Sequence, residues 1–152
     1  WMVKDKTIKP QQQVHYMALK VQKSAEHYTD AAMDEVELLN CIASERKKAE
    51  AVLLSGAAGN QQSIRDVEHS RFVATLLDSF QHQGPNGTHM CMVFSMLGCN
   101  LLSVIKAYNY RGIPLKAVKR MVRGICMGLD FLHRKCRIIH TGKKRGGPYF
   151  VR

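Results

Sequence analysis

The stretch Val14-His15-Tyr16-Met17-Ala18-Leu19-Lys20-Val21 decides the fold that we expect for the rest of the chain. Its apolar run predicts a β-strand, in which alternate side chains lie on opposite faces of a sheet. Lys20 stands at the end of this run. A lysine in such a place needs a carboxylate or a phosphate, unless its ammonium group reaches solvent along its own alkyl stem.

The next segment predicts a helix from about His27 to Cys41. Ala32, Val36 and Leu39 recur there at spacings of four and three, which is typical of a helix with one buried face. Thr29 is the expected N-cap, because a threonine hydroxyl can accept a hydrogen bond from a free amide of the first turn.

Three acids lie in the middle of this helix: Asp34, Glu35 and Glu37. At roughly 100° per residue, Glu35 lies about 60° from the centre of the apolar stripe, whereas Asp34 and Glu37 point to the far side. Glu35 is therefore the acid that can face a neighbouring sheet. The sequence predicts an ion pair between Lys20 and Glu35, with the other two acids in solvent.

A strand that ends in Ala-x-Lys, followed by a helix with an inward glutamate, resembles the protein kinases. In those enzymes the lysine binds nucleotide phosphates and the glutamate orients it. The longer run from Ala18 to Thr29, followed by Asp34-Glu35-Val36-Glu37-Leu38-Leu39, resembles the SR-protein-specific serine/threonine protein kinase family. The resemblance implies an α+β fold: a kinase small lobe with an antiparallel sheet and one helix, followed by the first helices of an incomplete large lobe.

A pair of strands is expected at Phe72–Phe80, of buried type, and at Thr88–Phe94, joined by the turn Gly84-Pro85-Asn86-Gly87. The family resemblance continues through the second of these strands. By position, Phe94 is the gatekeeper and the next three residues are the hinge that binds adenine through its backbone. The resemblance thus implies an ATP site composed of Ala18, Lys20, Glu35, Phe94, Ser95, Met96 and Leu97.

Two further helices are expected, from about Asn100 to Tyr108 and from Leu115 to Cys136, the latter the longest amphipathic helix. The buried stripe of the longer helix is predicted to be Val118, Val122, Ile125, Leu129 and Leu132. Lys116, Lys119, Arg120 and Arg123 lie off that stripe. Between Gly128 and Thr141 the family resemblance is again close.

The resemblance divides the chain into three parts. Residues 1–98 match a small lobe without its first strand and glycine-rich loop, and residues 99–141 match the start of a large lobe, whereas 142–152 match nothing in the family. A polar insertion is expected at 44–68. Within it, Glu45–Leu54 is compatible with a helix, and Ser55–Ser63 has linker composition and is expected to be poorly ordered.

The resemblance stops where the catalytic loop of a kinase begins. Gly142 stands at the position of the catalytic Asp, and Gly147 stands where a magnesium-binding Asn belongs. No catalytic residue is intact and no metal ligand is expected. The resemblance implies a fragment of a kinase that uses ATP and Mg²⁺ to phosphorylate Arg/Ser-rich splicing factors. The chain as it stands is expected to be catalytically inactive.

Composition restricts the remaining possibilities. Apolar residues make up 45% of the 152 residues, and the net charge is 23 − 12 = +11. Four of these charges lie in the tail, at Lys143, Lys144, Arg145 and Arg152, and the other cations are expected on solvated helix faces, so direct nucleic-acid binding is not expected. Five scattered cysteines without a Cys-x-x-Cys pair argue against a zinc site or a disulfide framework. No apolar run is long enough to predict a membrane span.

The resemblance implies a place in the cytoplasm and nucleus. Two alternatives to an active kinase stay open at the level of sequence. The first is a non-catalytic binding module, an orphan small lobe, which the missing Asp at Gly142 favours. The second is a basic, helical RNA-binding protein, which a salt-titrated RNA-binding assay would distinguish.

Overall fold

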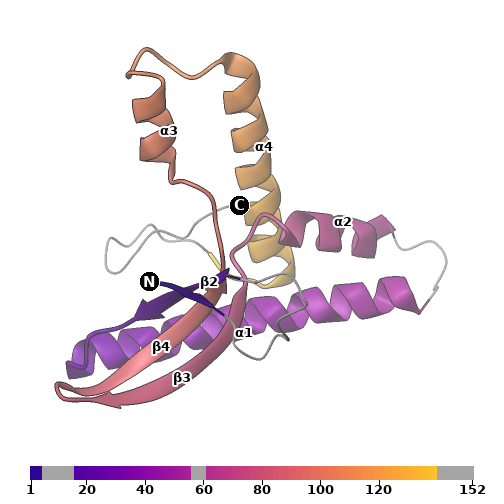
Figure 1. Cartoon of the computed structure of the whole chain (residues 1–152). Coiled ribbons are helices and arrows are strands. Elements are labelled where there is room, and N and C mark those ends of the chain that lie inside the picture. Colours follow the sequence, from indigo (N-terminus) through magenta and orange to yellow (C-terminus); the bar gives the residue numbers. More distant parts are fainter. Residues whose placement is uncertain (5–15, 56–60, 140–152) are drawn as a thin grey trace, which may run out of the picture. The chain divides into compact units, whose positions relative to one another are not determined.

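The computed structural model describes residues 1–4, 16–55 and 61–139 (Figure 1). Its elements are, in chain order, β1 (Met2–Lys4), β2 (Tyr16–Val21), α1 (Glu26–Leu54), α2 (Gln61–Ser70), β3 (Leu76–Gly84), β4 (Gly87–Ser95), α3 (Leu101–Ala107), α4 (Leu115–Asp130) and the π-helical turn η1 (Phe131–Lys135). The chain divides into two compact units. Unit 1 comprises Trp1–Ala43 and Thr75–Met96, and unit 2 comprises Ser44–Ala74 and Leu97–Arg152.

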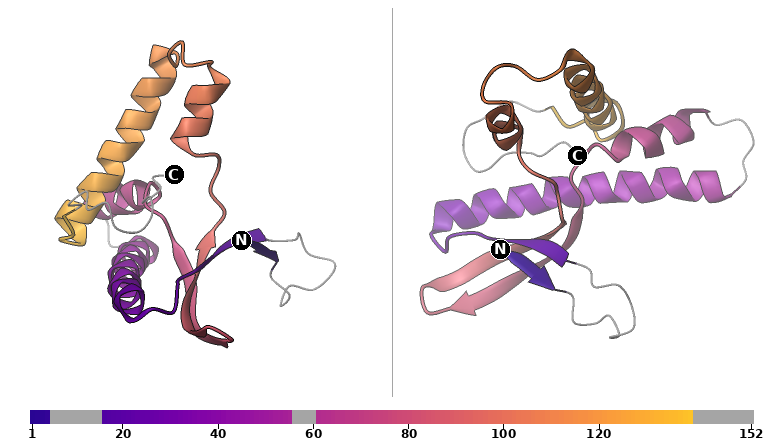
Figure 2. Two further views of the ribbon diagram at one scale, coloured as in Figure 1. Left: turned by 90° about the vertical axis from the view of Figure 1, so that its left-hand side faces the viewer. Right: turned by 45° about the horizontal axis from the view of Figure 1, so that its top comes forward.

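Unit 1 is built on a four-stranded antiparallel sheet with the order β1-β2-β4-β3. In the register of this sheet, Ala18 lies opposite Phe94 and Lys20 lies opposite Met92. The part of α1 that belongs to unit 1 runs along one face of the sheet (Figure 2). The predicted α+β architecture, an antiparallel sheet with helices, is confirmed.

The turn between β3 and β4 is where the sequence predicts it, with Gly84 paired to Gly87 across the hairpin. Gly87 has a φ of +108°, a conformation that side chains with a Cβ rarely adopt. A Cβ at this position would also lie 3.2 Å from the Cβ of Ser24. Glycine is therefore required here both by backbone conformation and by space.

The core of unit 1 consists of α1 residues on one side and sheet residues on the other. Its buried members are Ala32, Leu39, Ile42, Leu76, Cys91, Met92 and Val93. Ala32 and Leu39 belong to the predicted apolar stripe, and its third member, Val36, is half-buried. Asp34 and Glu37 are exposed, as predicted.

The start of α1 differs from the prediction. The helix begins at Glu26, and Thr29 lies within the first turn rather than at the cap. The amide of Thr29 donates to the carbonyl of Ala25 at 3.1 Å, so the first helical hydrogen bond forms before the expected N-cap. Glu26 favours this earlier start, because its negative charge is stabilised at the positive end of the helix dipole.

Within the insertion expected at 44–68, the helix at Glu45–Leu54 is confirmed, whereas a helix at 61–68 was not predicted. α1 continues without a break to Leu54, over 29 residues, and α2 forms at Gln61–Ser70. Strong helix formers fill 45–51, and Lys48 donates to Glu45 at 2.6 Å within the helix. Ser63 is buried inside α2, which contradicts the predicted disorder of 61–63, and residues 56–60 lie outside the described ranges.

The predicted strand at Phe72–Phe80 begins four residues late. β3 starts at Leu76 and is an edge strand, with Phe80 44% exposed, so it is not of buried type. The preceding segment is held differently, because the guanidinium group of Arg46 donates to the carbonyls of Ser70 and Val73. These bonds fix the chain after α2 and leave Phe72 outside the sheet.

Unit 2 contains α2, α3, α4 and η1. The side chain of Asn100 caps α3 by accepting from the amide of Ser103 at 2.8 Å, which confirms the helix predicted from Asn100 to Tyr108. The longer predicted helix exists, but its regular part ends at Asp130 and its last turn is π-helical. At 16 residues α4 is shorter than α1, which has 29 residues.

The buried face of α4 also differs from the prediction. Val122 and Ile125 are exposed, and the buried residues of α4 and η1 are Gly124, Met127, Gly128 and Phe131. Phe72 is the cause. A Cβ at Gly124 would lie 2.8 Å from its ring, and one at Gly128 would lie 3.1 Å from its carbonyl oxygen. The glycines of α4 form the surface on which Phe72 packs. Among the described residues, no helix is both long enough and apolar enough to span a membrane.

Candidate functional site

The site that the sequence predicts is centred on Lys20 of β2 and Glu35 of α1. The Nζ atom of Lys20 donates to both carboxylate oxygens of Glu35, at 2.7 Å each. The Lys20 side chain is 32% exposed and that of Glu35 is 18% exposed. The predicted ion pair is therefore confirmed, and one side of the lysine remains open to solvent.

The sheet fixes the position of this lysine. β2 lies between β1 and β4, so its backbone is hydrogen-bonded along both edges. Met92, which lies opposite Lys20 on β4, is completely buried. Ala18 precedes Lys20 by two residues and therefore shares its face of the strand. Its neighbour across the sheet is Phe94, so the structure brings these two predicted site residues together.

The residues expected to form a hinge follow directly after this pairing. Ser95 is the last residue of β4 and lies opposite Met17, and its amide donates to the carbonyl of Thr75 at 3.3 Å. Met96 is 40% exposed. The last segment of unit 1 ends at Met96 and the second segment of unit 2 begins at Leu97, so the predicted hinge contains one of the places at which the chain passes between the two compact units.

The chemistry available at Lys20 is phosphate binding. An ammonium group has three N–H donors, and Glu35 can engage two of them in this geometry. The remaining donor and the open side of the group can bind an anionic oxygen. Within the described ranges, no group of three or more His, Cys, Asp and Glu side chains is arranged to hold a metal ion. Gly142 and Gly147 lie outside those ranges.

A second cluster of charged residues, in unit 2, was missed by the sequence analysis. It joins α2 to α4 and η1. Asp66, whose side chain is 3% exposed, accepts from Arg134 at 2.6 Å and from Gln62 at 3.0 Å, and its Oδ2 lies 3.7 Å from the Nζ of Lys135. Asp130 interacts with Arg65 at 2.9 Å, with His69 at 2.8 Å and with Arg134 at 3.0 Å.

The pKa values of this cluster follow from its contacts. Burial by itself would raise the pKa of Asp66, but hydrogen bonds from Arg134 and Gln62 outweigh it, and the pKa lies below the ordinary value of 3.8. The hydrogen bond from Arg134 likewise lowers the pKa of Asp130, against burial and with help from His69. The hydrogen bond to Asp130 raises the pKa of Arg134. Asp66, Asp130 and Arg134 are therefore all charged at neutral pH.

The sequence contains a signal for part of this cluster. Gln62 and Asp66 are four residues apart, as are Asp130 and Arg134, and such pairs meet on one side of a helix. The contact between the two helices could not be predicted, because α2 itself was not expected. The cluster joins α2 to α4 and η1 within unit 2.

Comparison with known proteins identifies relatives of this chain, although no family model matches it. It is 48% identical over 128 residues to Serine/threonine-protein kinase SRPK of Physarum polycephalum, a match that covers 84% of this chain and 25% of that protein. It is 38% identical over 144 residues to Protein kinase dsk1 of Schizosaccharomyces pombe, covering 95% of this chain and 22% of the relative. It is 40% identical over 133 residues to SRSF protein kinase 3 of Homo sapiens, covering 88% and 20%.

The antiparallel sheet, its lysine and the helix glutamate that binds it are the features of a partial small lobe of a protein kinase. The names of the relatives identify the family within the protein kinases. The chain belongs to the SR-protein-specific serine/threonine kinase family. It spans a quarter or less of the length of these three relatives.

Proposed function

We propose that β2, α1 and the end of β4 form part of an ATP-binding site. In this proposal Lys20 binds phosphate oxygens and Glu35 holds the lysine in place. Ala18 and Phe94 contact the adenine, and the backbone of Ser95, Met96 and Leu97 binds its edge. The observation that carries the proposal is the ion pair in which both Glu35 oxygens accept from Nζ of Lys20 at 2.7 Å.

The ion pair supports this role for a physical reason. A lysine side chain has many rotamers, and binding a phosphate would require it to lose that freedom. Glu35 already restrains the ammonium group, so less entropy is lost when a phosphate binds. A hydrogen bond to a charged group contributes about 1.5–3 kcal/mol, which corresponds to about 10- to 100-fold in affinity.

We further propose that residues 1–98 are the small-lobe part and 99–141 the beginning of the large lobe of a kinase. The parent kinase would transfer phosphate from ATP, with Mg²⁺, to serines of Arg/Ser-rich proteins in the cytoplasm and nucleus. The names of the relatives, Serine/threonine-protein kinase SRPK and SRSF protein kinase 3, support the kinase activity and the substrate class in this proposal.

We also propose that this chain does not catalyse phosphoryl transfer. Gly142 has no carboxylate to accept the proton of a substrate hydroxyl, and Gly147 has no side-chain oxygen to bind magnesium. Phosphoryl transfer depends on positioning and on stabilisation of charge. Without these two groups the bound nucleotide would be held but not turned over.

A binding titration with a fluorescent ATP analogue tests the proposed ATP site. We expect measurable but weak binding, which Lys20→Met reduces by at least about tenfold. Lys23→Met is the matched control, because Lys23 is an exposed lysine close to the end of β2 and outside the ion pair. Equal affinity of wild type, Lys20→Met and Lys23→Met would contradict the proposed site.

A phosphorylation assay tests the proposal that this chain is catalytically inactive. With radiolabelled ATP, Mg²⁺ and an Arg/Ser-repeat peptide, we expect no incorporation above that of a sample without protein. Incorporation that disappears in the Lys20→Met variant would show that this chain is an active kinase and that the proposal about Gly142 is wrong.

A further inference from the structure

The segment between Asp78 and Asp130 contains no Asp or Glu, although it includes two helices of unit 2. Its cations gather on α4. Lys116, Lys119, Arg120 and Arg123 lie within an arc of about 100° around the helix axis, at 100° per residue. All four are exposed. We name these four residues the α4 basic face.

The cations of the α4 basic face lack the carboxylate partners that several other cations of the described structure have. Lys20, Arg65, Arg134 and Lys135 each pair with carboxylates. Within the described ranges none of the four α4 cations has such a partner. Like charges three and four residues apart destabilise an isolated helix, and a solvated helix surface normally mixes charges of both signs. A row of cations without carboxylates is suited to a polyanion.

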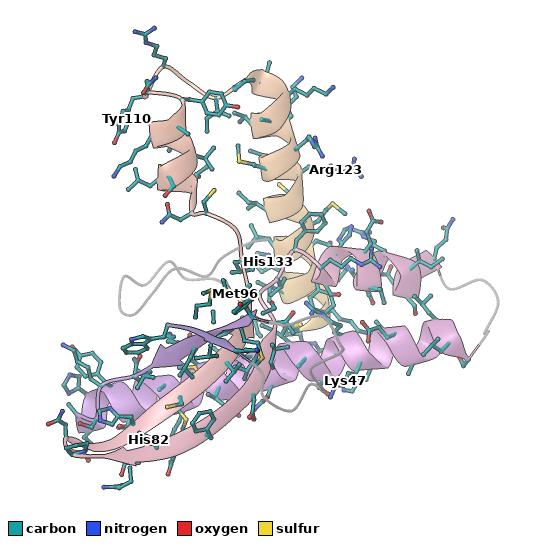
Figure 3. All side chains as sticks on the ribbon, in the orientation of Figure 1. Lys47, His82, Met96, Tyr110, Arg123 and His133 are labelled. Atoms are coloured by element: carbon teal, nitrogen blue, oxygen red, sulfur yellow. The ribbon has the colours of Figure 1, made fainter. Side chains whose placement is uncertain are left out.

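The arrangement favours a linear polyanion. Neighbouring members of the face are 5–6 Å apart at Cβ, and the row from Lys116 to Arg123 extends about 10 Å along the helix. Figure 3 shows Arg123 projecting from α4 on the side away from α3. An extended chain of phosphates could follow this row and contact each cation in turn.

The connection between α3 and α4 adds aromatic side chains. Tyr110 is 67% exposed and Tyr108 is 42% exposed. Asn109 and Tyr110 have φ values of 51° and 57°, and a bulky residue in this conformation is uncommon. Tyr110 precedes Lys116 by six residues, so at most about 20 Å of chain separates them. Exposed aromatic rings and a row of cations are the two elements by which proteins bind single-stranded nucleic acids without sequence preference.

We propose that the α4 basic face binds the phosphates of single-stranded RNA and that Tyr110 stacks on one of its bases. The net charge of the chain is a weak argument for this, because the tail supplies part of it. The proposal rests instead on the placement of the cations and tyrosines in unit 2. It does not depend on the proposed ATP site.

The test is fluorescence anisotropy of a labelled, mixed-sequence single-stranded RNA of 15 nucleotides, titrated with the 152-residue chain at 50–200 mM salt. Four phosphate contacts on a single strand predict a slope of log K against log[salt] of about −2.8. The affinity should therefore fall about 50-fold over this range. Replacing all four residues of the α4 basic face with glutamine should remove nearly all of that slope.

Three controls keep the test decisive. The variant Lys4→Gln/Lys23→Gln/Lys47→Gln/Arg71→Gln removes the same charge from four exposed sites elsewhere, and it should keep most of the affinity. If it loses as much as the α4 variant, net charge and not the α4 basic face is responsible, and the proposal is wrong. Circular dichroism should show equal helix content in both variants.

The second control is Tyr110→Ala, which should lower affinity about 5- to 100-fold without changing the salt slope, since stacking contributes about 1–3 kcal/mol per base. The third is a phosphoserine peptide of equal charge. If the peptide binds as tightly as RNA, or if Tyr110→Ala has no effect, the partner is a phosphoprotein or a generic polyanion and the assignment to RNA is overturned.

Discussion

Replacing Asp66 with asparagine tests whether the ion cluster of unit 2 attaches α2 to α4 and η1. Asp66 is nearly completely buried and accepts from Arg134 at 2.6 Å and from Gln62 at 3.0 Å. Asparagine keeps the shape of the side chain but removes its charge. Its amide nitrogen would also face one of these two donors, so at least one hydrogen bond is lost.

The size of the effect follows from the contacts. A hydrogen bond between charged groups contributes about 1.5–3 kcal/mol. Arg134 keeps Asp130 as a partner at 3.0 Å in the variant, so we expect a value in the lower half of this range, about 2 kcal/mol. This corresponds to about a 30-fold increase in the population in which α2 is detached.

Amide hydrogen exchange followed residue by residue measures this population directly, because exchange of α2 amides requires local opening. We expect the amides of α2 to exchange about 30-fold faster in Asp66→Asn and those of β2 and β4 to be unchanged. Glu68→Gln is the matched control, since Glu68 is an exposed acid of the same helix. If both variants exchange alike, the cluster does not hold α2, and the reasoning from burial and contact distances is refuted.

Three further predictions follow from particular residues. The pKa of Asp66 is lowered on folding, so its contribution to stability is present above pH 3.8 and is lost as the pH falls below that value. The midpoint of thermal unfolding should therefore fall more steeply below pH 4 in the wild type than in Asp66→Asn. Gly124→Ala should lower the midpoint of thermal unfolding by about 4 °C, because the new Cβ would lie 2.8 Å from the Phe72 ring. Gly98→Ala is the control and should leave the midpoint unchanged, because its Cβ would have no neighbour within 4 Å. Gly142→Asp alone should leave the peptide phosphorylation assay at background, because magnesium ligands would still be missing; turnover by this variant would show that one carboxylate suffices.

Local sequence patterns predicted most of unit 1 correctly. The strand at Tyr16–Val21, the Gly84–Gly87 turn and the Lys20–Glu35 pair each depend on residues close in sequence or on a single helical angle. The cap at Asn100 is likewise a local signal. Such features are predictable because alternation, helical periodicity and turn chemistry act over a few residues.

The errors arose where contacts distant in sequence determined the structure. Phe72 has the apolar neighbours of a strand residue, but it packs on the glycines of α4, which the sequence could not reveal. The same contact turned the buried face of α4 away from Val122 and Ile125. The linker composition of 55–63 concealed the start of α2, because Arg134 and Lys135, the charged partners of Asp66, lie more than sixty residues further along the chain.

The central claim is that Lys20 binds nucleotide phosphates and that Glu35 acts only by holding Lys20. A double-mutant cycle on the affinity for the fluorescent ATP analogue tests it most directly. We predict that Lys20→Met and Glu35→Gln each weaken binding, and that the variant with both changes is no weaker than Lys20→Met alone, because Glu35 has nothing to orient once the ammonium group is gone. Losses that add in the double variant, or undiminished binding by Lys20→Met, would contradict the claim.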